Sequence, residues 1–336
     1  MGLTASKPLT VPATSEHFHA LVAKLPRMDG KVVAVTGSTS GLGLVCARVC
    51  GSLGARVLLL NRDSARATAA VETLKSAGVK DVRHVSCDLQ SFASVRKAAE
   101  SLQSLCADSG IDVLCNNAGV MGLPNVATQD GYDVQMQTNH LSHFLLTLSV
   151  WPLLERAAAQ RGEARVVNHS SGARKKPGWA LDARYLGRNG GQLGTDWNPL
   201  SKWTRYQQSK LANLLFTYGL HTRAQAAGSP VKVVCAHPGA TLTDLQLKTA
   251  QAGGTSLIDY IVLSGTMKNA HSEEDGTEGI IMGCAAAGVQ SGEFYGPEGL
   301  TGPAVLLPAE RNETSEEMLW RESAKETGVD FPATRQ

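Results

Sequence analysis

Tyr206 and Lys210 are a phenol and an ammonium spaced four residues apart in the sequence. On a helix this spacing places both side chains on one face. A phenol with a pKa of about 10 is a poor base near neutrality, but an adjacent ammonium stabilises its phenolate, and a pKa lowered by about 3 units corresponds to about 4 kcal/mol. The pair therefore predicts proton exchange with an alcohol or carbonyl oxygen. The same spacing also occurs on helix faces that only meet solvent, so the surrounding sequence decides between the two interpretations.

The glycine-rich run Thr36–Gly43 (TGSTSGLG) follows an apolar stretch and opens directly into a helical pattern. Glycines at such a turn let the backbone approach a pyrophosphate, whose charge then lies against the amides of the helix N-terminus. A nucleophile elbow is excluded because it requires Ser in place of Thr39, and a mononucleotide P-loop is excluded because it requires Gly-Lys in place of Leu42-Gly43. The run predicts dinucleotide binding by Gly37, Ser38, Ser40, Gly41, Leu42 and Gly43.

The end of the second expected strand indicates which dinucleotide is bound. The chain has Asn61 and Arg62 where a carboxylate would hold the ribose 2′-hydroxyl of NAD. A guanidinium forms charge-assisted bonds to a 2′-phosphate, so NADP(H) is the expected cofactor, although Arg62 also fits a solvated arginine on a βα loop. Asp88 and Leu89 follow the third strand and are placed to meet the adenine; the Asp88 carboxylate also suits a cap of the next helix.

Strand-like runs alternate with helical patterns along most of the chain, which is typical of βαβ units in a parallel sheet. Strands are expected at 31–36, 56–60, 82–87, 113–116, 165–168, 231–236 and 304–307, and helices at 41–53, 64–77, 91–107, 132–159 and 206–227. The predicted fold class is α/β, a doubly wound Rossmann sheet of about seven parallel strands with helices on both faces. One domain is expected over 30–307, with an N-terminal extension (1–29) and a charged C-terminal tail (308–336).

Two stretches interrupt this alternation, 172–203 and 245–272. Long loops in a compact domain are usually functional, and ligands of such folds bind at the carboxyl edge of the sheet. We expect the first stretch, an insertion, to form the pocket wall and the second to form a substrate lid. Trp179, Trp197 and Trp203 lie in the insertion and fit either a small satellite core or a substrate surface.

Six motifs appear in one order along the chain: Thr36–Gly43, Asn116-Asn117-Ala118-Gly119, Asn139, Ser170-Ser171, Tyr206 with Lys210, and Pro238-Gly239. Together they resemble the short-chain dehydrogenase/reductase family over roughly residues 30 to 307. The runs NNAGVM, NHLSHFLL and SKLANLLF are similar to the branch of retinol dehydrogenases and WW-domain oxidoreductases. The gap from Ser171 to Tyr206 is longer than is usual in that branch, which leaves the substrate class open.

The resemblance implies a role for each matched residue. Tyr206 would be the general acid/base, and Lys210 would lower its pKa and hold the nicotinamide ribose. Ser171 would bond the substrate oxygen, and Asn139 would anchor a water that relays protons through Lys210. Further cofactor contacts are implied for Asn117, Ala118, Gly119, Pro238, Gly239, Thr241 and Thr243, the last bonding the carboxamide.

Composition limits the partners. The chain has 336 residues, 43% of them apolar, and a net charge of +2, so no global field recruits nucleic acid. The seven cysteines are scattered along the chain and fit no disulfide framework. The pairs Cys46 with Cys50 and His140 with His143 have no further ligands at metal-site spacing, so no metal is expected. The absence of a long apolar run or a secretory signal predicts a cytoplasmic location.

The N-terminus carries a separate signal, since Met1–Ser6 matches the pattern for myristoylation of Gly2. One acyl chain would give only weak, reversible membrane association.

The expected function is an NADP(H)-dependent oxidoreductase that interconverts a carbonyl and an alcohol on a small, moderately apolar substrate. A non-catalytic NADP(H)-binding scaffold and a lipid or retinoid reductase at a membrane surface stay open as alternatives, as does a homo-oligomeric state.

Overall fold

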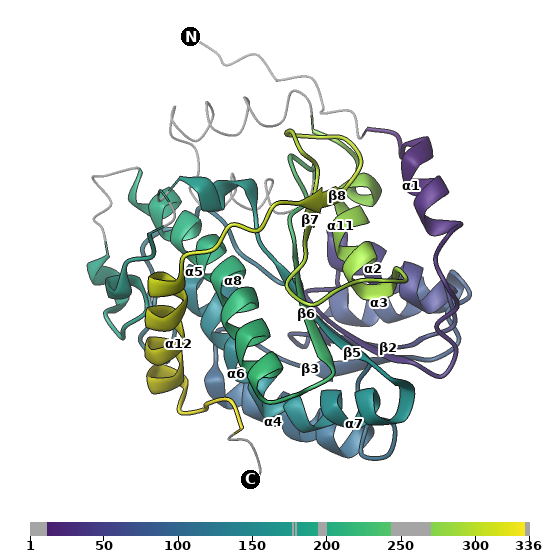
Figure 1. Ribbon diagram of the computed structural model, residues 1–336, viewed down its shortest axis with the longest axis horizontal. Coiled ribbons are helices and arrows are strands. Elements are labelled where there is room, and N and C mark those ends of the chain that lie inside the picture. Colours follow the sequence, from purple (N-terminus) through teal and green to yellow (C-terminus); the bar gives the residue numbers. More distant parts are fainter. Residues whose placement is uncertain (1–11, 177, 179, 194–199, 243–269, 333–336) are drawn as a thin grey trace.

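The computed structural model describes residues 12–176, 178, 180–193, 200–242 and 270–332, and these form an α/β layered fold (Figure 1). The central sheet has the strand order β3-β2-β1-β4-β5-β6-β7-β8. Its strands are β1 (Val32–Thr36), β2 (Arg56–Asn61), β3 (Val82–Ser86), β4 (Val113–Asn116), β5 (Ala164–His169), β6 (Val231–Ala236), β7 (Phe294–Gly296) and β8 (Val305–Leu307). The order reverses between β1 and β4, which is the place where doubly wound sheets bind ligands.

All neighbouring strands from β3 to β7 pair in parallel, and β8 pairs antiparallel with β7. The predicted doubly wound class is confirmed, with eight strands in place of about seven. β7 was not predicted because it has only three residues, too few for a periodic pattern. The central strands β1 and β4 are buried at every position, as a parallel sheet covered on both faces requires.

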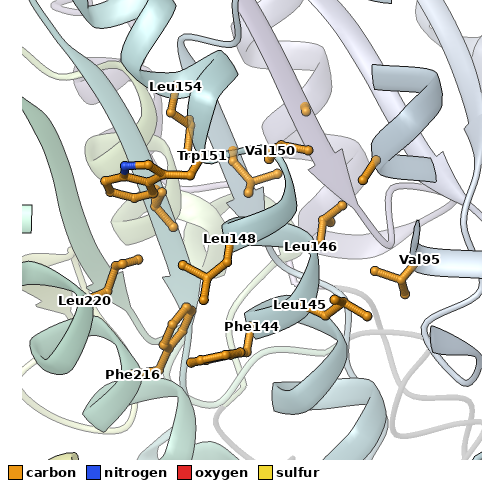
Figure 2. Packing of buried hydrophobic residues seen from close by; sticks show 14 of the residues in the cluster. Val95, Phe144, Leu145, Leu146, Leu148, Val150, Trp151, Leu154, Phe216 and Leu220 are labelled. Carbon is orange, nitrogen blue, oxygen red and sulfur yellow. The ribbon is translucent and has the colours of Figure 1, made fainter. Parts of the chain in front are cut away.

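Helices cover both faces of the sheet and bury two separate apolar clusters against it. One face carries α1 (Glu16–Val22), α2 (Gly41–Ser52), α3 (Ala65–Ser76) and α11 (Glu273–Ala285). The other carries α4 (Phe92–Leu105), α6 (Ser142–Ser149), α7 (Trp151–Arg161), α8 (Ser201–Ala226) and α12 (Glu313–Thr327). Figure 2 shows the second cluster, where Phe144 and Phe216 face each other with ring centroids 5.3 Å apart.

The single helix expected over 132–159 is instead interrupted. α5 (Val134–Met136) begins at Asp133, whose carboxylate accepts hydrogen bonds from the amides of Gln135 and Met136. A π-helical turn, η1 (Gln137–Leu141), then leads into α6, and α7 starts anew with Pro152 in its first turn. Proline fits a first turn because its missing N–H would have no partner there. The helical pattern over 132–159 did not reveal these breaks.

The segment expected as a charged tail contains α12. Asn312 caps this helix, and Trp320 is buried with its ring centroid 5.0 Å from that of Phe144. The expected N-terminal extension likewise contains α1, where Phe18 packs in the opposite cluster. Both helices were missed because exposed charged residues outnumber the few apolar anchors in these segments, which weakens the periodic signal.

The described residues of the insertion contain three short 3-10 turns, η2 (Gly172–Lys175), η3 (Ala183–Tyr185) and η4 (Gly190–Gln192), and α8 begins at Ser201, five residues earlier than predicted. Nearly all of the expected lid, as well as Gly2, Trp179 and Trp197, lies outside the described residues. Within the described part of the chain, no helix has the length and apolar character needed to cross a membrane.

Candidate active site

A cavity of about 1480 Å³ opens at the carboxyl ends of the parallel strands. Most of the predicted site residues line it: Gly37, Ser40, Gly41, Leu42, Gly43, Asn61, Arg62, Asp88, Leu89, Asn117, Ala118, Gly119, Ser171, Tyr206, Lys210, Pro238, Gly239 and Thr241. Ser38 and Asn139 are fully buried and do not line it. Thr243 lies outside the described residues.

The glycine-rich turn between β1 and α2 is packed so closely that side chains are excluded from it. Gly37 has a φ of +65°, and a Cβ there would lie 2.7 Å from the Cα of Ala118. A Cβ on Gly43 would lie 2.4 Å from both the Gly37 carbonyl oxygen and Asn117 Nδ2. Because α2 starts at Gly41, the free amides of its first turn face the cavity wall formed by this run. The turn has the shape of a phosphate cradle.

Ser38 and Asn61 support this turn from β2. The Ser38 amide donates to Asn61 Oδ1 over 2.8 Å, and Asn61 Nδ2 donates to Ser38 Oγ over 3.1 Å. The Ser38 side chain is fully buried beside Asn61 and positions the turn, and its direct contact with the cofactor stays a prediction.

A second hydrogen-bond chain, not predicted from the sequence, links the turn to the π-helical segment. Asn117 Nδ2 donates to the Thr36 carbonyl (2.9 Å), and the Ala118 amide donates to Thr36 Oγ1 (3.0 Å). His143 lies 2.9 Å from Thr36 Oγ1 through Nε2 and 3.0 Å from the Asn139 carbonyl through Nδ1. Burial lowers the pKa of His143 to about 4, so its ring is neutral at neutral pH.

The partners of this neutral ring fix its tautomer. The Asn139 carbonyl can only accept, so His143 Nδ1 carries the proton and Nε2 accepts from the Thr36 hydroxyl. The Thr36 hydroxyl then still accepts from the Ala118 amide. These hydrogen bonds therefore fix the position of the glycine-rich turn relative to Asn139, and no charged group takes part in them.

Asn139 lies in the π-helical turn, a local distortion common at functional sites. Its Nδ2 donates to the Val120 carbonyl (2.9 Å) and to Ser209 Oγ (2.8 Å), while its Oδ1 accepts from the Val120 amide (2.8 Å). Both amide hydrogens are thus used by protein groups. A Cβ on Gly119 would lie 3.3 Å from Asn139 Oδ1 and 3.2 Å from Lys210 Nζ, so the two polar atoms share the space in front of this glycine.

Tyr206 and Lys210 both line the cavity from α8, as their spacing predicts. Lys210 Nζ donates to the His169 carbonyl at 3.1 Å, and burial lowers the Lys210 pKa to about 8. Burial raises the pKa of Tyr206, and its hydrogen bond with Ser171 opposes this rise. The lowering of the Tyr206 pKa by Lys210 stays a prediction; in this structure the Lys210 ammonium donates to the His169 carbonyl, and burial is the largest influence on the phenol.

Ser171 is positioned by an arginine that sequence reasoning missed. Ser171 caps η2, and its carbonyl accepts from Arg174 Nη1 at 3.0 Å. Arg174 is buried, forms two hydrogen bonds of 2.7 and 2.9 Å with Glu310, and stacks over Phe294 with 4.4 Å to the ring centroid. No local pattern links residues 136 positions apart, so only the fold reveals this pair.

Part of the cavity lining is apolar. It includes Leu200, Trp203, Leu300 and Leu306, which come from three separate segments. Of the three insertion tryptophans, Trp203 thus lies on the cavity wall, which favours the substrate-surface interpretation for this residue.

Two arginines line the cavity from the first turn of α3 and the residues just before it. Arg62 and Arg66 are exposed and line the cavity, and Arg66 donates to Ser40 Oγ at 3.0 Å. Arg66 was not identified from the sequence because it lies one helical turn beyond the strand end. Asp88 lines the cavity close by and accepts from the Gln90 amide at 3.0 Å.

The remaining cavity wall comes from the loop after β6. Gly239 has a φ of +68°, and a Cβ there would lie 2.4 Å from the Leu300 carbonyl oxygen, so a side chain is excluded. Thr241 Oγ1 donates to the Pro238 carbonyl at 2.9 Å, and His271 Nε2 lies 2.6 Å from the same oxygen. These contacts hold the Pro238–Thr241 loop at the strand end.

The site fits a bound dinucleotide on two structural grounds. The glycine-rich turn excludes side chains where a phosphate backbone would lie. In addition, Thr138 lines the cavity while its Oγ1 is buried and has no hydrogen-bond partner among the described residues. A buried hydroxyl without a partner is rare and indicates a ligand group.

The comparisons with known proteins agree with this geometry. The model of the family described as short chain dehydrogenase matches residues 31–185. The chain is 32% identical to the polyprenol dehydrogenase of Mus musculus over 91% of this chain and 86% of that protein, and 31% identical to retinol dehydrogenase 13 of Homo sapiens over 92% and 88%. A solved structure of an uncharacterized protein from Mycobacterium paratuberculosis has a TM-score of 0.70 and 31% identity, covering 93% of this chain and 98% of that one. The chain belongs to the short-chain dehydrogenase/reductase family, whose members are oxidoreductases acting on alcohol or carbonyl groups with NAD(P)(H).

Proposed function

We propose that the protein is an NADP(H)-dependent oxidoreductase that reduces a carbonyl on an apolar substrate, or oxidises the corresponding alcohol, with Tyr206 as the general acid/base. The observation that carries the proposal is the grouping on one cavity wall of the Tyr206 phenol, its partner Ser171, and Lys210 held by the His169 carbonyl. Catalytic residues need this convergence of a proton donor, an orienting hydroxyl and a nearby cation.

The raised pKa of Tyr206 suits the proton-donating step of carbonyl reduction. A buried phenol with a raised pKa stays protonated at neutral pH and can donate its proton to a carbonyl oxygen as that oxygen gains charge. Ser171 holds the oxygen beside the phenol, and Lys210, with a pKa of about 8, is mostly an ammonium at pH 7 and holds the cofactor ribose. Bound NADPH supplies the hydride.

Asn139 would serve this site as a positioning residue. Its side chain fixes Val120, which lines the cavity, and Ser209, whose hydroxyl donates 2.7 Å to the Tyr206 carbonyl. The space shared by Asn139 Oδ1 and Lys210 Nζ in front of Gly119 suits the proposed proton relay.

Preference for NADP(H) is supported by Arg62 together with Arg66 and by the lack of a carboxylate at the end of β2. Two guanidinium groups at one end of the cavity offer several charge-assisted donors to a 2′-phosphate. Replacing each arginine by Ala should weaken NADPH binding by roughly 10- to 100-fold, the worth of a hydrogen bond to a charged group, and NADH binding far less. The exposed Arg321 on α12 is the matched control, and equal losses for both cofactors would reject the assignment.

An apolar substrate is supported by the leucine and tryptophan side chains in the cavity lining. The relatives named polyprenol dehydrogenase and retinol dehydrogenase 13 carry names of long apolar alcohols. We therefore expect turnover to rise with the apolar area of the carbonyl substrate.

The test is an NADPH-oxidation screen against aldehydes, ketones, quinones and retinoids. Tyr206→Phe should lower kcat by about 10²- to 10⁴-fold, the usual contribution of a general acid, and leave the NADPH dissociation constant unchanged. Tyr185→Phe, at a buried tyrosine that does not line the cavity, is the control and should keep its activity. A wild-type protein that binds NADPH and reduces nothing beyond Tyr206→Phe would favour the scaffold alternative.

A further inference from the structure

Four of the seven cysteines meet at one point inside the molecule. All seven are buried, and Cys46, Cys50, Cys115 and Cys284 gather between α2, β4 and α11. The sequence showed Cys46 and Cys50 one helical turn apart with no further soft ligand at metal-site spacing, which predicted no metal site. Sequence spacing does not show that the fold brings Cys115 and Cys284 to the same pair from positions 69 and 238 residues after Cys46.

The sulfur positions suit a tetrahedral ion. Cys46 Sγ and Cys284 Sγ are 3.7 Å apart, and the sulfur atoms of Cys46, Cys115 and Cys284 all lie within 4.8 Å of one another. Cys50 interacts with both Cys46 and Cys284. In a tetrahedral zinc site with Zn–S bonds of about 2.3 Å, the sulfur atoms are roughly 3.8 Å apart. The sulfur atoms of Cys46, Cys115 and Cys284 thus lie near the spacing of a tetrahedral site, whereas Cys50 is outside this group and its side chain must turn toward the ion to complete the site.

The surroundings restrict the kind of ion. The cluster lies in the apolar core that contains Val33, Val35 and Ile281, and among the described residues no carboxylate or imidazole lies close enough to these sulfurs to join them as a ligand. An all-sulfur site selects thiophilic ions such as Zn²⁺ over Mg²⁺ or Ca²⁺, which prefer oxygen. Hydrogen bonds among the four thiols, together with their burial, leave the pKa of each thiol raised, so without an ion they are neutral.

We propose that Cys46, Cys115 and Cys284, with Cys50 as fourth ligand, bind one thiophilic divalent ion of the zinc class. Each bound thiol releases one proton to solvent as its sulfur–metal bond forms, and no electron is transferred. The ion would join α11 to β4 and to α2, the helix that presents the glycine-rich turn to the cavity. It is a structural ion, separate from the reacting centre, because none of the four cysteines lines the cavity.

The experiment measures metal in the full-length, tag-free protein purified without chelators. Elemental analysis should find about one equivalent of zinc per chain, and protein refolded with Co²⁺ should show the strong sulfur-to-cobalt charge-transfer absorption of thiolate ligation. Cys284→Ala should lose the zinc and the absorption. Cys106→Ala, at an equally buried thiol outside the cluster, should keep both. Circular dichroism and NADPH binding verify that both variants fold.

Several results would overturn the site. Wild-type protein without zinc and without the cobalt absorption after refolding would mean that the thiols serve as core packing. Zinc retained in Cys284→Ala would place the ion elsewhere. A mass lower by two hydrogens under non-reducing conditions, with no metal, would identify a disulfide instead. If Cys284→Ala does not fold, the cobalt spectrum of the wild-type protein alone decides, since its intensity reports whether thiolates are bound.

Discussion

The two walls of the cavity are built in different ways. The cofactor wall consists of backbone turns, Thr36–Gly43 and Asn117–Gly119, joined by short hydrogen bonds between neighbouring strands. The substrate wall consists of side chains from distant segments, such as Arg174 on Glu310 and Trp203 on α8. The shape of the cofactor wall is set by glycines, which have no side chain. The shape of the substrate wall is set by contacts between side chains from different segments.

The two walls therefore have different functions: the first binds the cofactor, and the second selects the substrate. Phosphate groups are common to all dinucleotides, so a wall of backbone amides and glycines serves any of them. A substrate is selected by side-chain volume and charge, which long-range packing can alter without disturbing the sheet. Variants in the two walls should therefore affect different measurements, cofactor affinity for the first and substrate turnover for the second.

The largest effect is expected at Arg174, on the substrate wall. Arg174→Met removes one partner of a buried ion pair, in which the arginine is 1% and Glu310 19% exposed, and should lower the free energy of unfolding by about 3 kcal/mol. Because Arg174 also holds the Ser171 carbonyl, kcat/KM for the carbonyl substrate should fall while the NADPH dissociation constant changes little. Chemical denaturation and steady-state kinetics measure the two effects.

Arg184→Met is the control, because its ion pair with Asp182 is 65% and 47% exposed and should contribute less than about 1 kcal/mol. If Arg174→Met weakens NADPH binding as strongly as it lowers turnover, the two walls are not separable and the comparison fails.

The sequence predicted the cofactor wall more completely than the substrate wall. The glycine spacing, the strand ends and the Tyr206–Lys210 pair depend on local patterns, and the structure brings them to one cavity. Arg174 with Glu310, and Thr36 with His143, depend on contacts between segments far apart in the chain, for which a single sequence carries no signal. α12 was missed for the same reason, since Trp320 stabilises the helix through Phe144 and Phe216 rather than through its own pattern.

A smaller effect is expected from Gly43→Ala, on the cofactor wall. The new Cβ would lie 2.4 Å from the Gly37 carbonyl oxygen and Asn117 Nδ2, so the turn must shift, at a cost of about 1–3 kcal/mol for overpacking. NADPH affinity should fall by roughly tenfold or more, while KM for the carbonyl substrate at saturating NADPH stays near its original value. Fluorescence titration with NADPH measures the first quantity. Gly187→Ala is the control, because a Cβ there meets no atom within 4 Å, and it should change neither the NADPH affinity nor the KM for the carbonyl substrate. An unaltered NADPH affinity in Gly43→Ala would show that the turn is not tightly packed.

The smallest effect concerns Lys210, which lies where the two walls meet. Burial lowers its pKa from 10.5 to about 8, so the ammonium that is proposed to hold the cofactor ribose is lost as the pH rises through about 8. Since kcat/KM for NADPH reports groups of the free enzyme, it should fall about tenfold per pH unit above that value. Tyr206, with its raised pKa, remains protonated there and cannot produce the decline. His143, with its pKa of about 4, is neutral throughout the range.

Lys210→Arg distinguishes this origin, because a guanidinium stays charged across the range and the decline near pH 8 should disappear even where the rate itself is lower. A decline that persists unchanged in this variant would assign the titration to another group. The Lys210 ammonium contacts the His169 carbonyl at the end of β5, the strand that precedes Ser171. It also lies, with Asn139 Oδ1, next to Gly119 on the cofactor wall. A pH profile that Arg174→Met leaves in place and Lys210→Arg removes would assign the titration to Lys210 and not to the substrate wall.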